Sequence, residues 1–114
     1  MEKCTWKATL LPGKKAEYIR RHDALWPEMA ETLRQAGIRN YTIWCYGDEL
    51  FGYYECERGA AYAARVQAES PVVARWNEYM RDVMRMEFDP NTGTAVALEP
   101  VFAFRVDEGD GPCS

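Results

Sequence analysis

The feature that most constrains the fold of this sequence is a regular alternation of β-rich segments with segments of helical periodicity. The predicted segments are a strand over 4–11, a helix over 14–36, strands over 38–46 and 50–56, a short helix over 60–68, a helix from Ser70-Pro71 to about Met86, and a strand over 97–106. Gly37 is a typical helix stop, residues 47–49 form a short hairpin turn, and Ser70 is a typical N-cap. The order β-α-β-β-α-β predicts an α+β, ferredoxin-like fold with helices on one face of an antiparallel sheet.

The length of 114 residues and the mass of 13.1 kDa correspond to one domain, which we assign to residues 1–106. Residues 107–114 are acidic and contain two glycines. We expect them to form a disordered acidic tail.

Composition excludes several function classes. The net charge is −4, whereas a nucleic-acid-binding surface is normally basic. No apolar run approaches the roughly 20 residues that span a bilayer, so we expect no membrane association. No signal peptide precedes the cysteines, which indicates reduced thiols in the cytoplasm. A metal site is not expected, because there is one histidine and no C-x-x-C pair among Cys4, Cys45, Cys56 and Cys113.

The first helical segment has a single apolar stripe. At about 100° per residue, its members are Tyr18, His22, Leu25, Trp26, Met29 and Leu33. His22 is central in this stripe and is expected to face the sheet, with the hydroxyl of Tyr18 one turn earlier on the same face. Pro27 is expected to kink the helix one turn after His22, because it removes a backbone donor.

The second long helix and the second strand repeat this aromatic patterning. Trp76 is central in a stripe with Val72, Tyr79, Met80 and Val83. Alternation along strand 38–46 places Tyr41, Ile43 and Cys45 on one face, and Asn40, Thr42, Trp44 and Tyr46 on the other. Two helices cover only one face of such a sheet. We therefore expect the other aromatic face to meet a partner, most simply a second copy of the chain.

His22 has two interpretations. In the first it is a core residue whose ring nitrogens bond to a tyrosine or to the backbone. In the second it belongs to a pocket, because burying an imidazole among aromatic rings is unfavourable unless its nitrogens find partners. Indole faces and hydroxyl groups suit a sugar, and an imidazole exchanges protons near neutral pH.

The motifs of this chain resemble a known family. Residues 18–28, with Tyr18, His22 four positions later and then Trp26-Pro27-Glu28, resemble the first-helix signature of the L-rhamnose mutarotase family. Similarity continues over residues 37–41, 70–84 and 99–102, so the resemblance covers about residues 3–104.

The resemblance implies a dimeric α/β barrel of ferredoxin-like subunits. It implies interconversion of the α and β anomers of L-rhamnose, or of a related deoxy-sugar, without metal or cofactor. It further implies that His22 is the proton donor and that Tyr18, Tyr41 and Trp76 bind the sugar. The family often has a second Trp after the first, and Asn77 holds that position here, so we place Asn77 in the same sugar-binding set. Departures in the loop 88–93 and at Ala103 leave the identity of the sugar open.

Two other function classes stay open. One is a cofactor-free or haem-degrading monooxygenase on the same dimeric barrel, in which His22 would be the haem ligand and added haem would give a Soret shift. The other is a non-catalytic sugar-binding module, which would bind rhamnose without accelerating anomer exchange.

Overall fold

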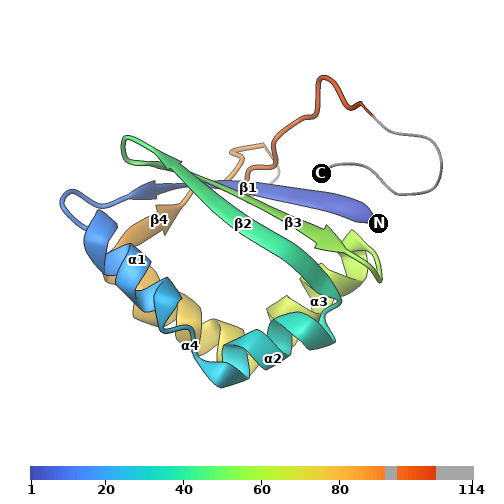
Figure 1. Ribbon diagram of the computed structural model, residues 1–114, viewed down its shortest axis with the longest axis horizontal. Helices are drawn as coiled ribbons and strands as arrows, with labels where there is room; N and C mark the ends of the chain where they lie inside the picture. Colours follow the sequence, from blue (N-terminus) through green and yellow to red (C-terminus); the bar gives the residue numbers. More distant parts are fainter. Residues whose placement is uncertain (92–94, 105–114) are drawn as a thin grey trace.

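A computed structural model describes residues 1–91 and 95–104 of the chain. Its elements are β1 (Glu2–Leu10), α1 (Lys15–Asp23), α2 (Pro27–Gln35), β2 (Ile38–Tyr46), β3 (Glu49–Cys56), α3 (Ala60–Glu69), α4 (Pro71–Tyr79), the 3₁₀ turn η1 (Met80–Asp82) and β4 (Met84–Met86). The strands form one antiparallel sheet in the order β2-β3-β1-β4. The helices lie on one face of the sheet, and the C-terminal segment passes over the other (Figure 1). The α+β class and the β-α-β-β-α-β order are confirmed.

The prediction of the fourth strand was wrong in position. It was expected over 97–106, but the fourth strand is β4, in which Met84 pairs with Leu10 and Met86 with Ala8. Residues 97–104 contain no strand, and 105–106 lie outside the described residues, as does the predicted tail 107–114. The helix predicted to reach Met86 ends at Tyr79, because Val83 is fully buried and its carbonyl accepts from the amide of Leu11. That bond brings the chain directly to the free edge of β1.

The single helix predicted over 14–36 is two helices in the structure. Trp26 has extended backbone angles (φ −60°, ψ 135°), and Pro27 is the first residue of α2. A proline disfavours helical geometry in the residue before it and has no amide hydrogen, so it begins a helix more readily than it continues one. The break leaves α1 as a short helix of its own.

The main core lies between the sheet and the helices. Its buried members are Trp6, Ala8, Leu10, Tyr18, Met29, Leu50, Val73, Trp76, Met80 and Val83. The buried residues of β1 alternate along the strand, as expected for a sheet with one covered face. No helix within the described residues is long and apolar enough to cross a membrane.

The opposite face of the sheet is rich in aromatic side chains. Trp44 and Tyr53 lie side by side on it, with ring centroids 6.4 Å apart. The segment 95–104 passes along this face, where Thr5 Oγ1 bonds to both backbone groups of Leu98. Val101 and Phe102 on this segment are 93% and 81% exposed. A large apolar surface is therefore open on the side without helices.

Candidate functional site

A pocket of about 360 Å³ opens between α1 and the inner face of β2. It is lined by Leu10, Lys15, Tyr18, Ile19, His22, Asp23, Tyr41, Ile43, Trp44, Cys45 and Leu50. This volume lies within the range of pockets that hold small organic molecules. Three of the five residues predicted to form the site, Tyr18, His22 and Tyr41, line this pocket together.

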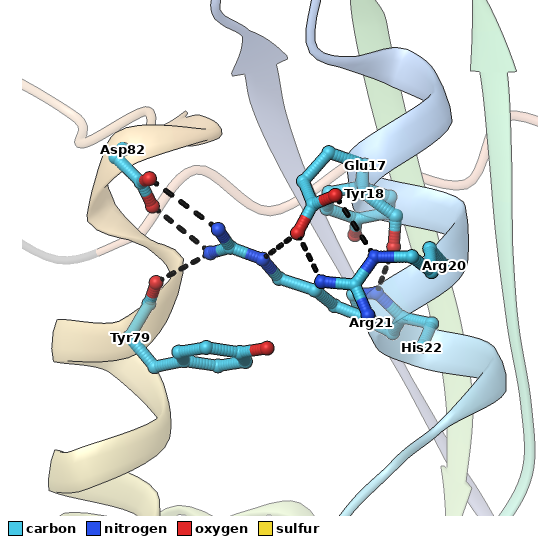
Figure 2. A network of polar contacts seen from close by, with 7 residues as sticks. All are labelled: Glu17, Tyr18, Arg20, Arg21, His22, Tyr79 and Asp82. Carbon is cyan, nitrogen blue, oxygen red and sulfur yellow. Dashed lines mark hydrogen bonds and ion pairs between the residues drawn. The ribbon is translucent and has the colours of Figure 1, made fainter.

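The α1 helix brings Tyr18 and His22 together. They are four residues apart, so their side chains lie one above the other on the same face. Their rings stack with centroids 4.3 Å apart, and His22 Nδ1 lies 3.0 Å from the backbone oxygen of Tyr18 (Figure 2). A carbonyl oxygen only accepts hydrogen bonds, so Nδ1 carries a proton in both charge states of the ring. The nitrogen that gains and loses a proton is therefore Nε2.

The charge of His22 is set mainly by its burial. Burial lowers the pKa of His22 below its usual 6.5, while the Tyr18 carbonyl and the charge of Asp23 act in the opposite direction. The lowered pKa makes neutral imidazole the main form at neutral pH, with its lone pair on Nε2. The resting ring is thus a proton acceptor.

The hydroxyl of Tyr18 is buried and has no hydrogen-bond partner within the described part of the chain. Burial also raises the pKa of Tyr18, so the phenol stays protonated at neutral pH. Buried polar atoms in folded proteins are nearly always hydrogen-bonded. An unpaired hydroxyl in a pocket wall is therefore suited to a polar ligand.

A β-bulge in β2 positions Tyr41. The pairing with β3 shifts between Arg39 and Thr42, and Asn40 adopts a left-handed backbone (φ 53°). The extra residue turns the Tyr41 ring toward the inner face, where its hydroxyl accepts a 2.7 Å bond from Trp6 Nε1. Burial raises the pKa of Tyr41, so this phenol also stays neutral.

Gly52 of β3 makes room for the indole that holds Tyr41. A Cβ atom at position 52 would overlap the Trp6 ring. The glycine therefore lets Trp6 lie flat against β3 and reach the tyrosine hydroxyl.

Trp76 and Asn77 lie outside the pocket lining. Trp76 is buried in the core and meets the His22 ring edge-on, with centroids 5.4 Å apart. It also packs against Trp26 at 5.1 Å. Trp76 thus packs against the His22 ring from the core. Asn77, at the next position of α4, is exposed.

Four polar or aromatic lining residues were not among the predicted site residues: Lys15, Asp23, Trp44 and Cys45. Cys45 had a usable signal, because it alternates with Tyr41 and Ile43 on one face of its strand. Asp23 is charged and lies outside the apolar stripe, but as the last residue of α1 it also lines the pocket. Within the described residues, no group of three His, Cys, Asp or Glu side chains is placed to hold a metal ion.

Comparisons with known proteins point to one family. The sequence model described as L-rhamnose mutarotase matches residues 3–104. An L-rhamnose mutarotase of Burkholderia cenocepacia (strain HI2424) is 41% identical over 102 residues, which covers 90% of this chain and 97% of that protein. One of Jannaschia sp. (strain CCS1) is 42% identical over 106 residues, with the same coverage of both chains. The crystal structure of an L-rhamnose mutarotase from Formosa agariphila superposes with a TM-score of 0.73 at 30% identity, over 91% of this chain and 99% of that chain.

Proposed function

This chain belongs to the L-rhamnose mutarotase family, and we propose that it exchanges the anomers of its sugar by proton transfer at His22. An L-rhamnose mutarotase is an isomerase that interconverts the α and β anomers of a carbohydrate. The observation that carries the proposal is the geometry of His22, whose Nδ1 is engaged by a backbone carbonyl while Nε2 is left for a ligand in the pocket. The family match does not favour a monooxygenase or a non-catalytic module.

The reaction needs two proton movements. One proton leaves the hydroxyl on the anomeric carbon, the bond from that carbon to the ring oxygen breaks, and the ring oxygen gains a proton. The open aldehyde rotates about its bond to the next carbon, and the ring closes from the other face by the reverse steps. The protein exchanges no electrons with the sugar and forms no covalent bond to it. The two anomers contain the same atoms, so the reaction is an isomerisation.

His22 is suited to both proton movements. In its neutral resting form Nε2 accepts the proton of the anomeric hydroxyl, and the imidazolium formed is then the donor to the ring oxygen. Tyr18 and Tyr41 have raised pKa values, so both stay neutral and act as hydrogen-bonding groups that hold the sugar. This division agrees with the implied role of His22 as proton donor.

Trp76 and Asn77 complete the proposed sugar-binding set. The support for Trp76 is indirect, because its indole edge fixes the ring of His22. The support for Asn77 is its position next to Trp76, where the family often has a second indole. We propose L-rhamnose as the substrate, and related deoxy-sugars are distinguished by measuring exchange rates over a panel of sugars.

The test is the His22→Gln variant, assayed by NMR saturation transfer between the two anomeric protons of L-rhamnose. We expect exchange to fall about 10²- to 10⁴-fold toward the uncatalysed rate, because positioned acid–base catalysis contributes this much. Melting temperature and oligomeric mass serve as controls for folding. Wild-type exchange in a folded variant would contradict the assignment, and an unchanged wild-type rate in EDTA would support a metal-free reaction.

The active form that we propose is a homodimer that closes a dimeric α/β barrel. The support is the aromatic sheet face without helices and the exposed side chains of Val101 and Phe102 beside it. Sedimentation should give twice the 13.1 kDa mass of the chain. Phe102→Asp should yield monomers, whereas Ala64→Asp, on the exposed side of α3, should not. A monomeric wild-type protein at micromolar concentration would contradict the dimer.

We place the enzyme in the cytoplasm, without membrane or nucleic-acid partners. The support is the acidic net charge of −4 and the free thiols of Cys4, Cys45 and Cys56. Fractionation of cells that express the tagged chain tests this location.

A further inference from the structure

The α1 helix carries His22 but has little packing of its own. Tyr18 is its one buried residue, whereas α2 and α4 each bury two. The turn at Pro12-Gly13 precedes it and the break at Ala24–Trp26 follows it. Acid–base catalysis requires the reacting groups to be held to within fractions of an ångström. Something other than apolar burial must therefore hold α1 against the rest of the domain.

Arg21, next to His22, supplies such a connection. Its guanidinium reaches from α1 to the end of α4 and to η1 (Figure 2). Nη1 donates to the backbone oxygen of Tyr79 at 2.7 Å and to Asp82 Oδ1 at 2.9 Å, and Nη2 donates to Asp82 Oδ2 at 3.3 Å. Nε donates to Glu17 Oε2 at 2.7 Å, within α1.

The same guanidinium lies over an aromatic ring. Arg21 Cζ is 4.3 Å from the centroid of the Tyr79 ring, which is a cation–π distance. The Arg21 side chain is only 11% exposed and its partner Asp82 is 67% exposed, so the guanidinium is shielded by its packing on the Tyr79 ring while the carboxylate stays in contact with water. A planar fork with two bonds to one carboxylate also fixes orientation, which an ammonium group does not.

Two neighbouring residues of α1 thus contact two successive turns of α4. His22 meets Trp76, and Arg21 meets Tyr79 three residues later. Trp76 and Tyr79 are themselves in contact, with centroids 5.6 Å apart. The rings and the guanidinium form one connected group that fixes both the position and the rotation of α1.

We propose that Arg21 is a positioning residue for anomer exchange, which sets the direction of His22 Nε2 by tying α1 to Tyr79 and Asp82. This inference rests on the proposed role of His22. Arg21 does not touch the sugar, because it is absent from the pocket lining. Its effect reaches the reaction through the placement of the helix.

The residues of the opposite pocket wall indicate how the loss of Arg21 should affect kcat and KM. Tyr41, Ile43 and Trp44 belong to β2, whereas the hydrogen bonds of Arg21 to the described residues go to Glu17, Tyr79 and Asp82. Loss of Arg21 should therefore leave much of the sugar-binding surface in place while His22 is misdirected. We expect kcat to fall more than KM rises.

The test compares Arg21→Gln with Arg34→Gln by saturation transfer over a range of L-rhamnose concentrations. Arg34 lies on α2 and forms an ion pair with Glu31 of the same helix, so its loss removes the same charge and an ion pair that stays within one helix. For Arg21→Gln we expect kcat to fall about 10- to 100-fold, because small misplacements of reacting groups have effects of this size. For Arg34→Gln we expect a change within about twofold.

A second variant and a spectroscopic readout separate positioning from stability. Asp82→Asn weakens the connection from the η1 side, leaves α1 unaltered and should lower kcat in the same direction. The ring ¹⁵N and ¹³C NMR signals of His22 should shift in Arg21→Gln and Asp82→Asn, and Arg21→Lys should restore part of kcat.

The outcomes are distinct. Lowered melting temperature with unchanged kcat per folded molecule and unchanged His22 signals, in either Arg21→Gln or Asp82→Asn, overturns the proposal. If His22→Gln is fully active, the proposed function fails as well. If His22→Gln is inactive while Asp82→Asn and Arg21→Gln keep the wild-type kcat, only the role of Arg21 fails.

Discussion

The imidazole of His22 stacks on the phenol of Tyr18 and bonds to the backbone oxygen of the same residue. One residue thus fixes both the plane of the imidazole and the tautomer that it adopts. The same tyrosine directs an unpaired hydroxyl into the buried part of the site. One turn of α1 therefore carries both the proposed proton-transfer group, His22, and a proposed sugar-binding hydroxyl, that of Tyr18.

The pH dependence of exchange should follow His22. Because burial lowers the pKa of His22 below 6.5, activity should rise as the ring loses its proton and should be level at neutral pH. Saturation transfer between pH 5 and 8, corrected for spontaneous exchange, measures this. A rate that falls as pH rises through 6 would instead require a charged resting ring.

Folding stability should change with pH in the same direction. The unfolded ring binds a proton below about 6.5, while the folded ring binds it only at lower pH. Between these two pKa values the unfolded chain holds more protons, so the free energy of unfolding increases as pH rises toward 6.5. The free energy of unfolding, measured by urea titration at several pH values, should rise more steeply with pH over this window in the wild type than in His22→Gln.

Tyr18→Phe should weaken sugar binding without weakening the fold. The hydroxyl makes no hydrogen bond in the described part of the chain, so its removal should leave the melting temperature equal or higher. A lost bond to the sugar should raise KM about 2- to 10-fold. Tyr62→Phe, on α3, is the control. A lower melting temperature with unchanged KM would place the hydroxyl in the fold and away from the sugar.

Gly52→Ala should disturb the pocket by displacing Trp6, which holds the hydroxyl of Tyr41. The added Cβ meets the Trp6 indole, and such overpacking costs about 1–3 kcal/mol of stability. The displaced indole should also lose its bond to Tyr41, which raises KM. Trp6→Phe removes that bond without the clash and should also raise KM, with a loss of stability from the smaller ring in the core. Unchanged KM in both variants would show that Tyr41 is held by other contacts.

Trp76 and Asn77 should respond differently to truncation. Trp76 is 7% exposed, and replacing it by alanine should lower the free energy of unfolding by about 3–5 kcal/mol. Asn77 is exposed, so Asn77→Ala should change stability by less than about 0.5 kcal/mol. The proposed sugar contact predicts a raised KM in Asn77→Ala. If calorimetry shows wild-type affinity, Asn77 leaves the sugar-binding set.

The described cysteines should react with iodoacetamide in a fixed order. Cys45 is exposed and lines the pocket, so it should react fast and be protected by L-rhamnose. Cys56 is buried, and burial with the nearby Cys4 thiol raises the pKa of Cys56 to about 12, so it should react last. Peptide mass spectrometry at several times gives each rate. Equal rates at Cys45 with and without sugar would argue against binding in this pocket.

Much of the site could be predicted from local sequence. Helical spacing places Tyr18 and His22 on one face whatever the rest of the domain does, and strand alternation separates Tyr41 from Thr42. The bulge at Asn40 shifts the pairing of β2 with β3, so that Tyr41 lies on the inner face of the sheet. The residue types around Asn40 do not predict this bulge.

The remaining features depend on long-range packing. The Met84–Met86 strand has the alternation of a strand, but its three residues continue the apolar pattern of the preceding helix, and only the free edge of β1 decides between the two. The contacts of Arg21 with Tyr79 and Asp82 join positions about 60 residues apart, and periodicity gives no information at that separation.

The pocket is built from one uninterrupted stretch of chain. Within the part that the structure describes, every lining residue falls between Leu10 and Leu50. The helices α3 and α4 hold this stretch in place and contribute nothing to its inner surface. Exchange of this block between relatives by homologous recombination would move the whole pocket lining in one event, so sugar preference can diverge while the second half of the gene keeps the residues that hold α1 in place, Trp76, Tyr79 and Asp82.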